Sequence, residues 1–81
     1  MIFLLEYDRP SGQLISIEPF EDDAADAADD RRLALELSLM DRQLSREVVL
    51  LQASSEAQLR RTHRRYFARV EELASASIDP P

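Results

Sequence analysis

A stretch near the C-terminus combines a histidine, two aromatic residues and five arginines within a few helical turns. Residues 59–70 read L-R-R-T-H-R-R-Y-F-A-R-V, and His63 is the only histidine of the chain. Catalysis at His63 would require an orienting carboxylate and a nucleophile or substrate clamp at a defined spacing. No serine or acidic residue has such a spacing to His63, and one histidine without cysteine is a weak basis for a metal site. We therefore predict no catalytic residue, no cofactor-binding residue and no metal ligand.

Drawn as a helix, the same stretch separates into an apolar side and a basic side. At about 100° per residue, one narrow arc contains Leu59, His63, Tyr66, Val70 and Leu73. We interpret this arc as the side that faces the core, which makes His63 and Tyr66 structural residues. The alternative is a small-ligand sensor or enzyme with a pocket beside His63 and Tyr66.

The basic side of this helix is a candidate partner surface. It consists of Arg60, Arg61, Arg64, Arg65 and Arg69. Like charges three or four positions apart on a helix repel one another mildly, so this row favours an anionic partner, such as the acidic segment of the same or a neighbouring subunit. Nucleic acid is the second possibility, although the net charge of −6 argues against general phosphate binding. A nucleic-acid accessory protein is therefore an alternative function.

Composition limits the remaining possibilities. The chain of 81 residues is long enough for one domain and has no cysteine, so it cannot form disulfides or thiolate metal sites. No apolar run approaches the roughly 18 residues of a membrane span, and the apolar start lacks the cationic residues of a signal peptide. These features predict a cytoplasmic protein without a membrane segment. Residues 21–30, E-D-D-A-A-D-A-A-D-D, resemble a solvated helix start, with weak cation binding as the open alternative.

The hydrophobic pattern predicts an α+β fold of a single domain. Pro10 and the only glycine, Gly12, mark a hairpin turn. The predicted order is ββαβα, with strands at 2–8, 13–18 and 47–52. The first helix begins at 24 and ends where a polar connection over 41–46 starts, with an end at Leu44 as the alternative. The second helix spans 55–74. A domain over residues 1–74 would then leave 75–81 as a flexible tail.

These elements predict a two-layer sandwich. The first strand is apolar on both faces and the second is polar on one, which places the first in the centre of the sheet. The expected sheet is three-stranded and antiparallel, in the order 2-1-3, with both helices on one face. The other apolar face of the sheet would then be uncovered, which favours a homodimer.

The first helix carries leucines on both of its sides. We predict that Leu33, Leu37, Met40 and Leu44 face the core, because they follow helical spacing. Leu35 and Leu39 would then project from the far side, as a candidate oligomer contact. Taken together, the sequence predicts a non-catalytic, self-associating protein-interaction module that binds as a homodimer.

Overall fold

The structure is a computed structural model, and its description covers residues 1–67. A three-stranded sheet lies at its centre, formed by β1 (Ile2–Asp8), β2 (Gln13–Phe20) and β3 (Glu47–Gln52). The strand order is β2-β1-β3 and both pairings are antiparallel. The predicted α+β class and sheet order are therefore confirmed. Gly12 closes the β1–β2 hairpin at φ 69°, and its N–H donates to the Asp8 carbonyl at 2.9 Å.

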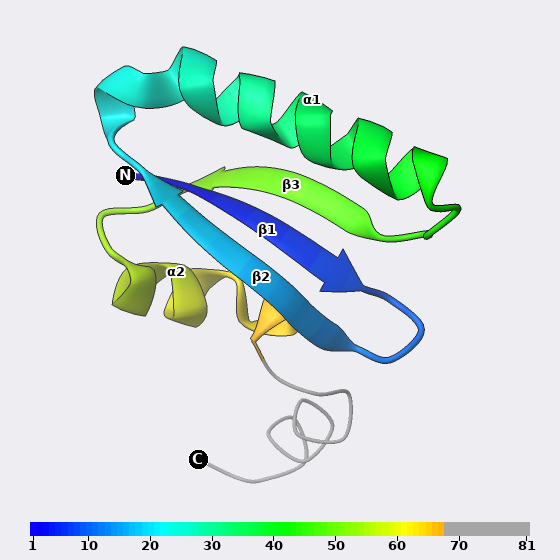
Figure 1. The fold of residues 1–81 in the computed structure, drawn as a ribbon. Coiled ribbons are helices and arrows are strands. Elements are labelled where there is room, and N and C mark those ends of the chain that lie inside the picture. Colours follow the sequence, from blue (N-terminus) through cyan, green and yellow to red (C-terminus); the bar gives the residue numbers. More distant parts are fainter. Residues whose placement is uncertain (68–81) are drawn as a thin grey trace, which may run out of the picture.

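The two helices lie on opposite faces of this sheet. A 3-10 turn, η1 (Asp22–Ala24), leads into α1 (Ala25–Asp41), while α2 (Glu56–Thr62) is followed by a second 3-10 turn, η2 (Arg64–Tyr66). Figure 1 shows α1 on one side of the strands and α2 on the other. Neither helix of the described part of the chain is long and apolar enough to cross a bilayer.

Each face of β1 supports its own hydrophobic core. Its odd positions belong to the α2-side core, which contains Phe3, Leu5, Tyr7, Leu59 and Tyr66. The even-numbered Leu4 belongs to the α1-side core, with Leu35 and Leu39. The predicted placement of both helices on one face is therefore wrong, and the molecule has three layers. The physical reason is that a strand apolar on both faces needs cover on both faces, and one helix covers each.

Helix α1 turns the opposite side to the sheet from the one predicted. Its buried residues are Ala28, Leu35 and Leu39. Leu33 and Leu37 share their side of the helix with Asp26 and Asp30, at the spacing i, i+4, i+7, i+11. Burial of that side would have taken two short carboxylates out of water, which is costly. The sheet therefore packs against the leucine stripe that begins with a small residue, Ala28.

Helix α2 begins where it was predicted and ends much earlier. The Ser55 hydroxyl accepts a hydrogen bond from the Gln58 N–H at 3.1 Å, which caps the first turn. The helix ends at Thr62, because His63 has φ −125° and ψ 53°. The continuous helix to residue 74 is thus wrong within the described residues. Val70, Leu73, the domain boundary at 74 and the tail 75–81 lie outside them.

Candidate functional site

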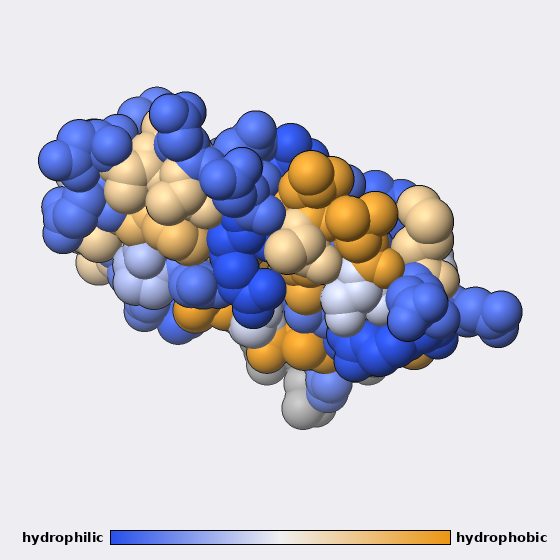
Figure 2. All heavy atoms as spheres, turned by 45° about the horizontal axis from the view of Figure 1, so that its top comes forward, coloured by the Kyte–Doolittle hydropathy of each residue, from blue (hydrophilic) through white to orange (hydrophobic). Residues whose placement is uncertain are grey.

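Four large hydrophobic side chains are exposed along α1 and in the turn after it. Their exposed fractions are 53 % for Leu33, 54 % for Leu37, 72 % for Met40 and 39 % for Leu44. Figure 2, in which the α1 side comes forward, shows hydrophobic side chains on the surface between strongly hydrophilic ones. Single exposed leucines are common in proteins, but four large hydrophobic side chains at helical spacing along one helix and the turn after it make a candidate interaction surface. We call these four residues the α1 stripe.

The turn after α1 places Leu44 at the end of this stripe. Gln43 has φ 57°, in the left-handed region, and it follows the last helical turn. The Gln43 N–H donates to the Met40 carbonyl at 3.1 Å, and the Leu44 N–H donates to the Leu39 carbonyl at 2.9 Å. These two bonds form the Schellman motif that commonly ends a helix. The helix therefore ends at Asp41, where the sequence predicted a polar connection to begin, and the alternative end at Leu44 is wrong.

An open groove lies between the end of α1 and β3. Its volume is about 530 Å³, and it is lined by Glu36, Leu39, Met40, Gln43, Leu44, Ser45, Arg46 and Val48. Arg46 donates a hydrogen bond to the carboxylate of Glu6, which is only 6 % exposed. A buried carboxylate without this partner would be strongly destabilising. The groove therefore joins the α1 stripe to the start of β3 and has a fixed ion pair at its polar end.

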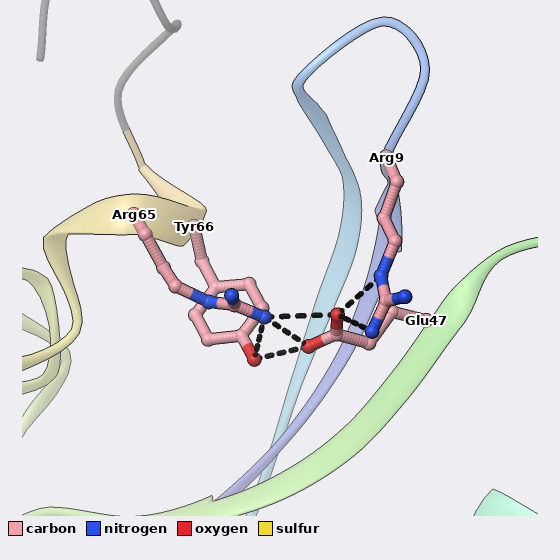
Figure 3. A network of polar contacts seen from close by, with 4 residues as sticks. All are labelled: Arg9, Glu47, Arg65 and Tyr66. Carbon is pink, nitrogen blue, oxygen red and sulfur yellow. Dashed lines mark hydrogen bonds and ion pairs between the residues drawn. The ribbon is translucent and has the colours of Figure 1, made fainter. Parts of the chain in front are cut away.

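On the opposite face of the sheet, three side chains, those of Arg9, Arg65 and Tyr66, meet at Glu47 (Figure 3). The Tyr66 hydroxyl donates to Glu47 Oε2, and Arg65 Nη2 donates to the two carboxylate oxygens at 2.9 and 2.6 Å. Arg9 Nε donates to Glu47 Oε1 at 2.8 Å. The carboxylate therefore connects β3 to the β1–β2 hairpin and to η2.

Hydrogen bonding controls the protonation of this cluster. The Tyr66 hydroxyl, assisted by Arg9 and Arg65, lowers the pKa of Glu47 to about 2, although burial opposes the shift. Burial, followed by the hydrogen bond to Glu47, raises the pKa of Tyr66. A general base needs a pKa near the working pH and a free lone pair directed at a substrate. The contacts of Glu47 instead fix an ionised carboxylate, as expected of a structural latch.

The two residues of the predicted pocket lie in different elements: His63 ends α2, and Tyr66 belongs to η2. Tyr66 is buried in the α2-side core, where its ring meets that of Tyr7 edge to face at 5.2 Å between centroids. His63 is half-buried, and its backbone N–H donates to the Leu59 carbonyl at 2.9 Å. The two residues are close along the chain but have separate structural tasks. Neither lines the groove beside α1.

The predicted arginine surface is divided by the break at His63. Arg65 binds Glu47 and lies over the Tyr66 ring at 4.5 Å. Arg60 pairs with Glu56 at 3.2 Å and lies over the Phe67 ring at 4.6 Å. Arg61 and Arg64 are exposed, and Arg69 lies outside the described residues. Two of the five arginines thus serve intramolecular contacts, and the helical row expected for Arg61, Arg65 and Arg69 is interrupted after Thr62.

The acidic segment also makes contacts within the protein. Asp22 pairs with the N-terminal ammonium group of Met1 at 2.8 Å, and the hydrogen bond and charge of that group lower the pKa of Asp22. Arg32 pairs with Asp29 at 2.6 Å and with Glu36 at 2.7 Å. Within residues 1–67, no three histidine or acidic side chains come together as metal ligands would.

A comparison with known protein families, characterised proteins and solved structures finds no significant match.

The predicted oligomer contact at Leu35 and Leu39 changes place in the structure. Both leucines are buried against the sheet, so they are not available to a second subunit. The residues expected in the core, Leu33, Leu37, Met40 and Leu44, form the exposed stripe instead. The sequence does contain a signal for the correct orientation: Asp26 and Asp30 lie on the same side of the helix as Leu33 and Leu37. Carboxylates on that side indicate that it faces water and that the other leucines face the sheet.

Proposed function

We propose that this protein is a non-catalytic protein-interaction module that self-associates as a homodimer through the α1 stripe. The exposure of Leu33, Leu37, Met40 and Leu44 on one side of the molecule is the observation that carries the proposal. An isolated monomer would keep this stripe in contact with water. A second copy presents the same stripe, so a two-fold symmetric contact removes both from water at once. The cytoplasmic location expected from the composition is part of this proposal.

The free energy gained by burying the α1 stripe is enough for a weak association. Full burial of a leucine or methionine side chain yields about 1.5–3 kcal/mol, and each of these residues is already partly buried. Burial of the exposed part of four side chains on each of two copies therefore contributes roughly 8 kcal/mol. Association costs about 4–15 kcal/mol in lost translational and rotational freedom. The stripe can drive a weak dimer, and a tighter one needs further contacts.

Sedimentation velocity over a range of about 1–200 µM, where weak dimers dissociate, tests the proposal. We expect the wild-type protein to shift from its monomer mass of 9.3 kDa toward twice that mass as the concentration rises. Leu37→Glu places a charge in the middle of the stripe and should leave a folded monomer. Ile15→Glu is the matched control, because Ile15 is 43 % exposed but lies on β2, away from α1. A wild-type protein that stays monomeric throughout the range would refute the proposal.

A further inference from the structure

The outer edge of β3 has backbone groups that point away from the sheet. The backbone nitrogen of Ala53 donates to the Met1 carbonyl at 3.0 Å, and that of Met1 donates to the Ala53 carbonyl at 2.9 Å. Residues 1 and 53 are therefore a hydrogen-bonded pair, and such pairs alternate along an antiparallel ladder. In the observed register, the pairs at Leu51 and Val49 follow the same pattern. The N–H and C=O groups of the even positions, Val48, Leu50 and Gln52, consequently face outward.

Edge β3 has none of the features that normally protect an exposed strand. The opposite edge, β2, contains Pro19 together with Ser16 and Glu18, and proline and charge discourage further pairing. The middle of β3, Val48–Leu51, is an uninterrupted apolar run. No strand of residues 1–67 lies beyond β3. This edge is therefore ready to add a strand.

We infer that the added strand is β3 of a second copy, so that two three-stranded sheets join into one antiparallel six-stranded sheet. The inference rests on the proposed self-association and specifies its geometry. A two-fold axis at Leu50 pairs Leu50 with its own counterpart, and Val48 with Gln52 of the other copy. All three outward-facing residues of each strand are then hydrogen-bonded. An axis nearer Glu47 would satisfy fewer groups and bring two like charges together.

The position of α1 fits this arrangement. Helix α1 packs on Leu4 of β1 and on Val48 and Leu50 of β3, so it lies over the junction of these strands. Strands in a sheet are about 4.8 Å apart, which places two such helices roughly 10 Å apart across the new junction. Packed helices have axes about 8–10 Å apart. The flanks of the two α1 helices that line the groove beside β3, with Glu36 and Met40, would therefore come into contact as the strands pair.

The direction of the two helices also fits this arrangement. The two-fold axis makes the helices antiparallel, so the acidic start of each helix, with Asp26 and Asp30, lies away from the acidic start of the other. A parallel arrangement would instead place the acidic ends side by side. A second copy thus matches this edge in hydrogen bonding and in helix spacing.

Amide hydrogen exchange, followed residue by residue by NMR, tests the inference on the wild-type protein. Exchange of the Val48, Leu50 and Gln52 amides should slow at least about tenfold as the dimer population rises, because these amides become hydrogen-bonded. The Val49 and Leu51 amides already bond to β1, so they serve as internal controls that change little.

A proline substitution separates edge pairing from contact between helices alone. Gln52→Pro removes an outward N–H but no bond to β1, and we expect it to weaken the dimer at least about tenfold, through two lost bonds per dimer. Gln52→Ala keeps the N–H and should dimerise as the wild type does. A wild-type dimer with unprotected Val48 and Leu50 amides, unaffected by Gln52→Pro, would overturn the edge pairing and leave the proposed function standing. A wild-type protein that stays monomeric would overturn both.

Discussion

Replacement of Glu47 by glutamine tests the latch between β3, the hairpin and η2. Glutamine keeps the size of the side chain and removes its charge, so Arg9, Arg65 and the Tyr66 hydroxyl lose their ionised acceptor. The Glu47 side chain is only 10 % exposed, and charge-assisted hydrogen bonds at such a position are stronger than neutral ones. We expect the substitution to lower the free energy of unfolding without changing the fold.

The pKa of Glu47 sets the size of this effect. A pKa of about 2 in the folded protein, against 4.5 for an unperturbed glutamate, corresponds to roughly 3 kcal/mol at neutral pH. The side chains of Arg9 and Arg65 are 74 % and 60 % exposed, so solvent screens part of their attraction. The expected loss for Glu47→Gln is therefore about 1–3 kcal/mol at pH 7.

The same pKa fixes the sign of the pH dependence. Because the folded protein holds Glu47 ionised to lower pH than the unfolded chain does, the unfolded chain binds the proton first as the pH falls. The stabilisation is complete well above pH 4.5, decreases below it, and is lost as the pH passes through about 2. The stability difference between wild type and Glu47→Gln should therefore shrink toward zero over this window. The other carboxylates titrate in both proteins and largely cancel in the difference.

Urea denaturation followed by far-UV circular dichroism, at fixed protein concentration and at several pH values from 7 to 2, measures this difference. Glu18→Gln is the matched control, since Glu18 is also a strand carboxylate paired with an arginine, Arg31 at 3.2 Å. Glu18 is 44 % exposed, and we expect its replacement to cost less than about 1 kcal/mol. An equal loss in the free energy of unfolding for the two substitutions would refute the structural role of the Glu47 contacts. So would a stability difference between wild type and Glu47→Gln that does not vary with pH.

Two further substitutions test the packing of α1 and the hairpin turn. Leu39→Ala, at a site 3 % exposed, should lower the free energy of unfolding by about 2–4 kcal/mol, whereas Leu37→Ala should lower it by less than about 0.5 kcal/mol in the monomer. Urea denaturation at a concentration where the monomer predominates compares the two variants. A larger loss for Leu37→Ala than for Leu39→Ala would contradict the observed orientation of α1. Gly12→Ala should cost about 1 kcal/mol, because φ is 69° at that position; thermal unfolding measures it, and an unchanged midpoint would contradict the turn geometry.

The strands were the most predictable part of the fold. The ranges 2–8 and 47–52 agree with β1 and β3, and the second strand extends two residues further than predicted, through Pro19 to Phe20. The reason is that strand signals are local: apolar runs, the Gly12 turn and a proline at an edge position. The central place of β1 followed from the contrast between its two apolar faces and the polar face of β2.

The candidate site was less predictable because it depends on contacts between distant residues. Nothing near Glu47 in the sequence indicates that Arg9, Arg65 and Tyr66 would converge on it. Helical periodicity alone predicted that Tyr66 would continue the arc of Leu59. Both residues do enter one core, but the chain leaves the helix at His63 to bring them there. The local preference for a helix is overridden by the hydrogen bonds and ring packing that Tyr66 gains.

The differences in how the two helices pack on the sheet have one physical origin. The sequence contains more apolar surface than one sheet face and one side of each helix can bury. The prediction placed the surplus on the uncovered face of the sheet and on Leu35 and Leu39. The folded chain instead covers both sheet faces and leaves the surplus on the stripe of α1, where Asp26 and Asp30 keep that side of the helix in water. Self-association therefore remains the proposed function, but its proposed surface moves to the outer side of α1 and the neighbouring edge of β3.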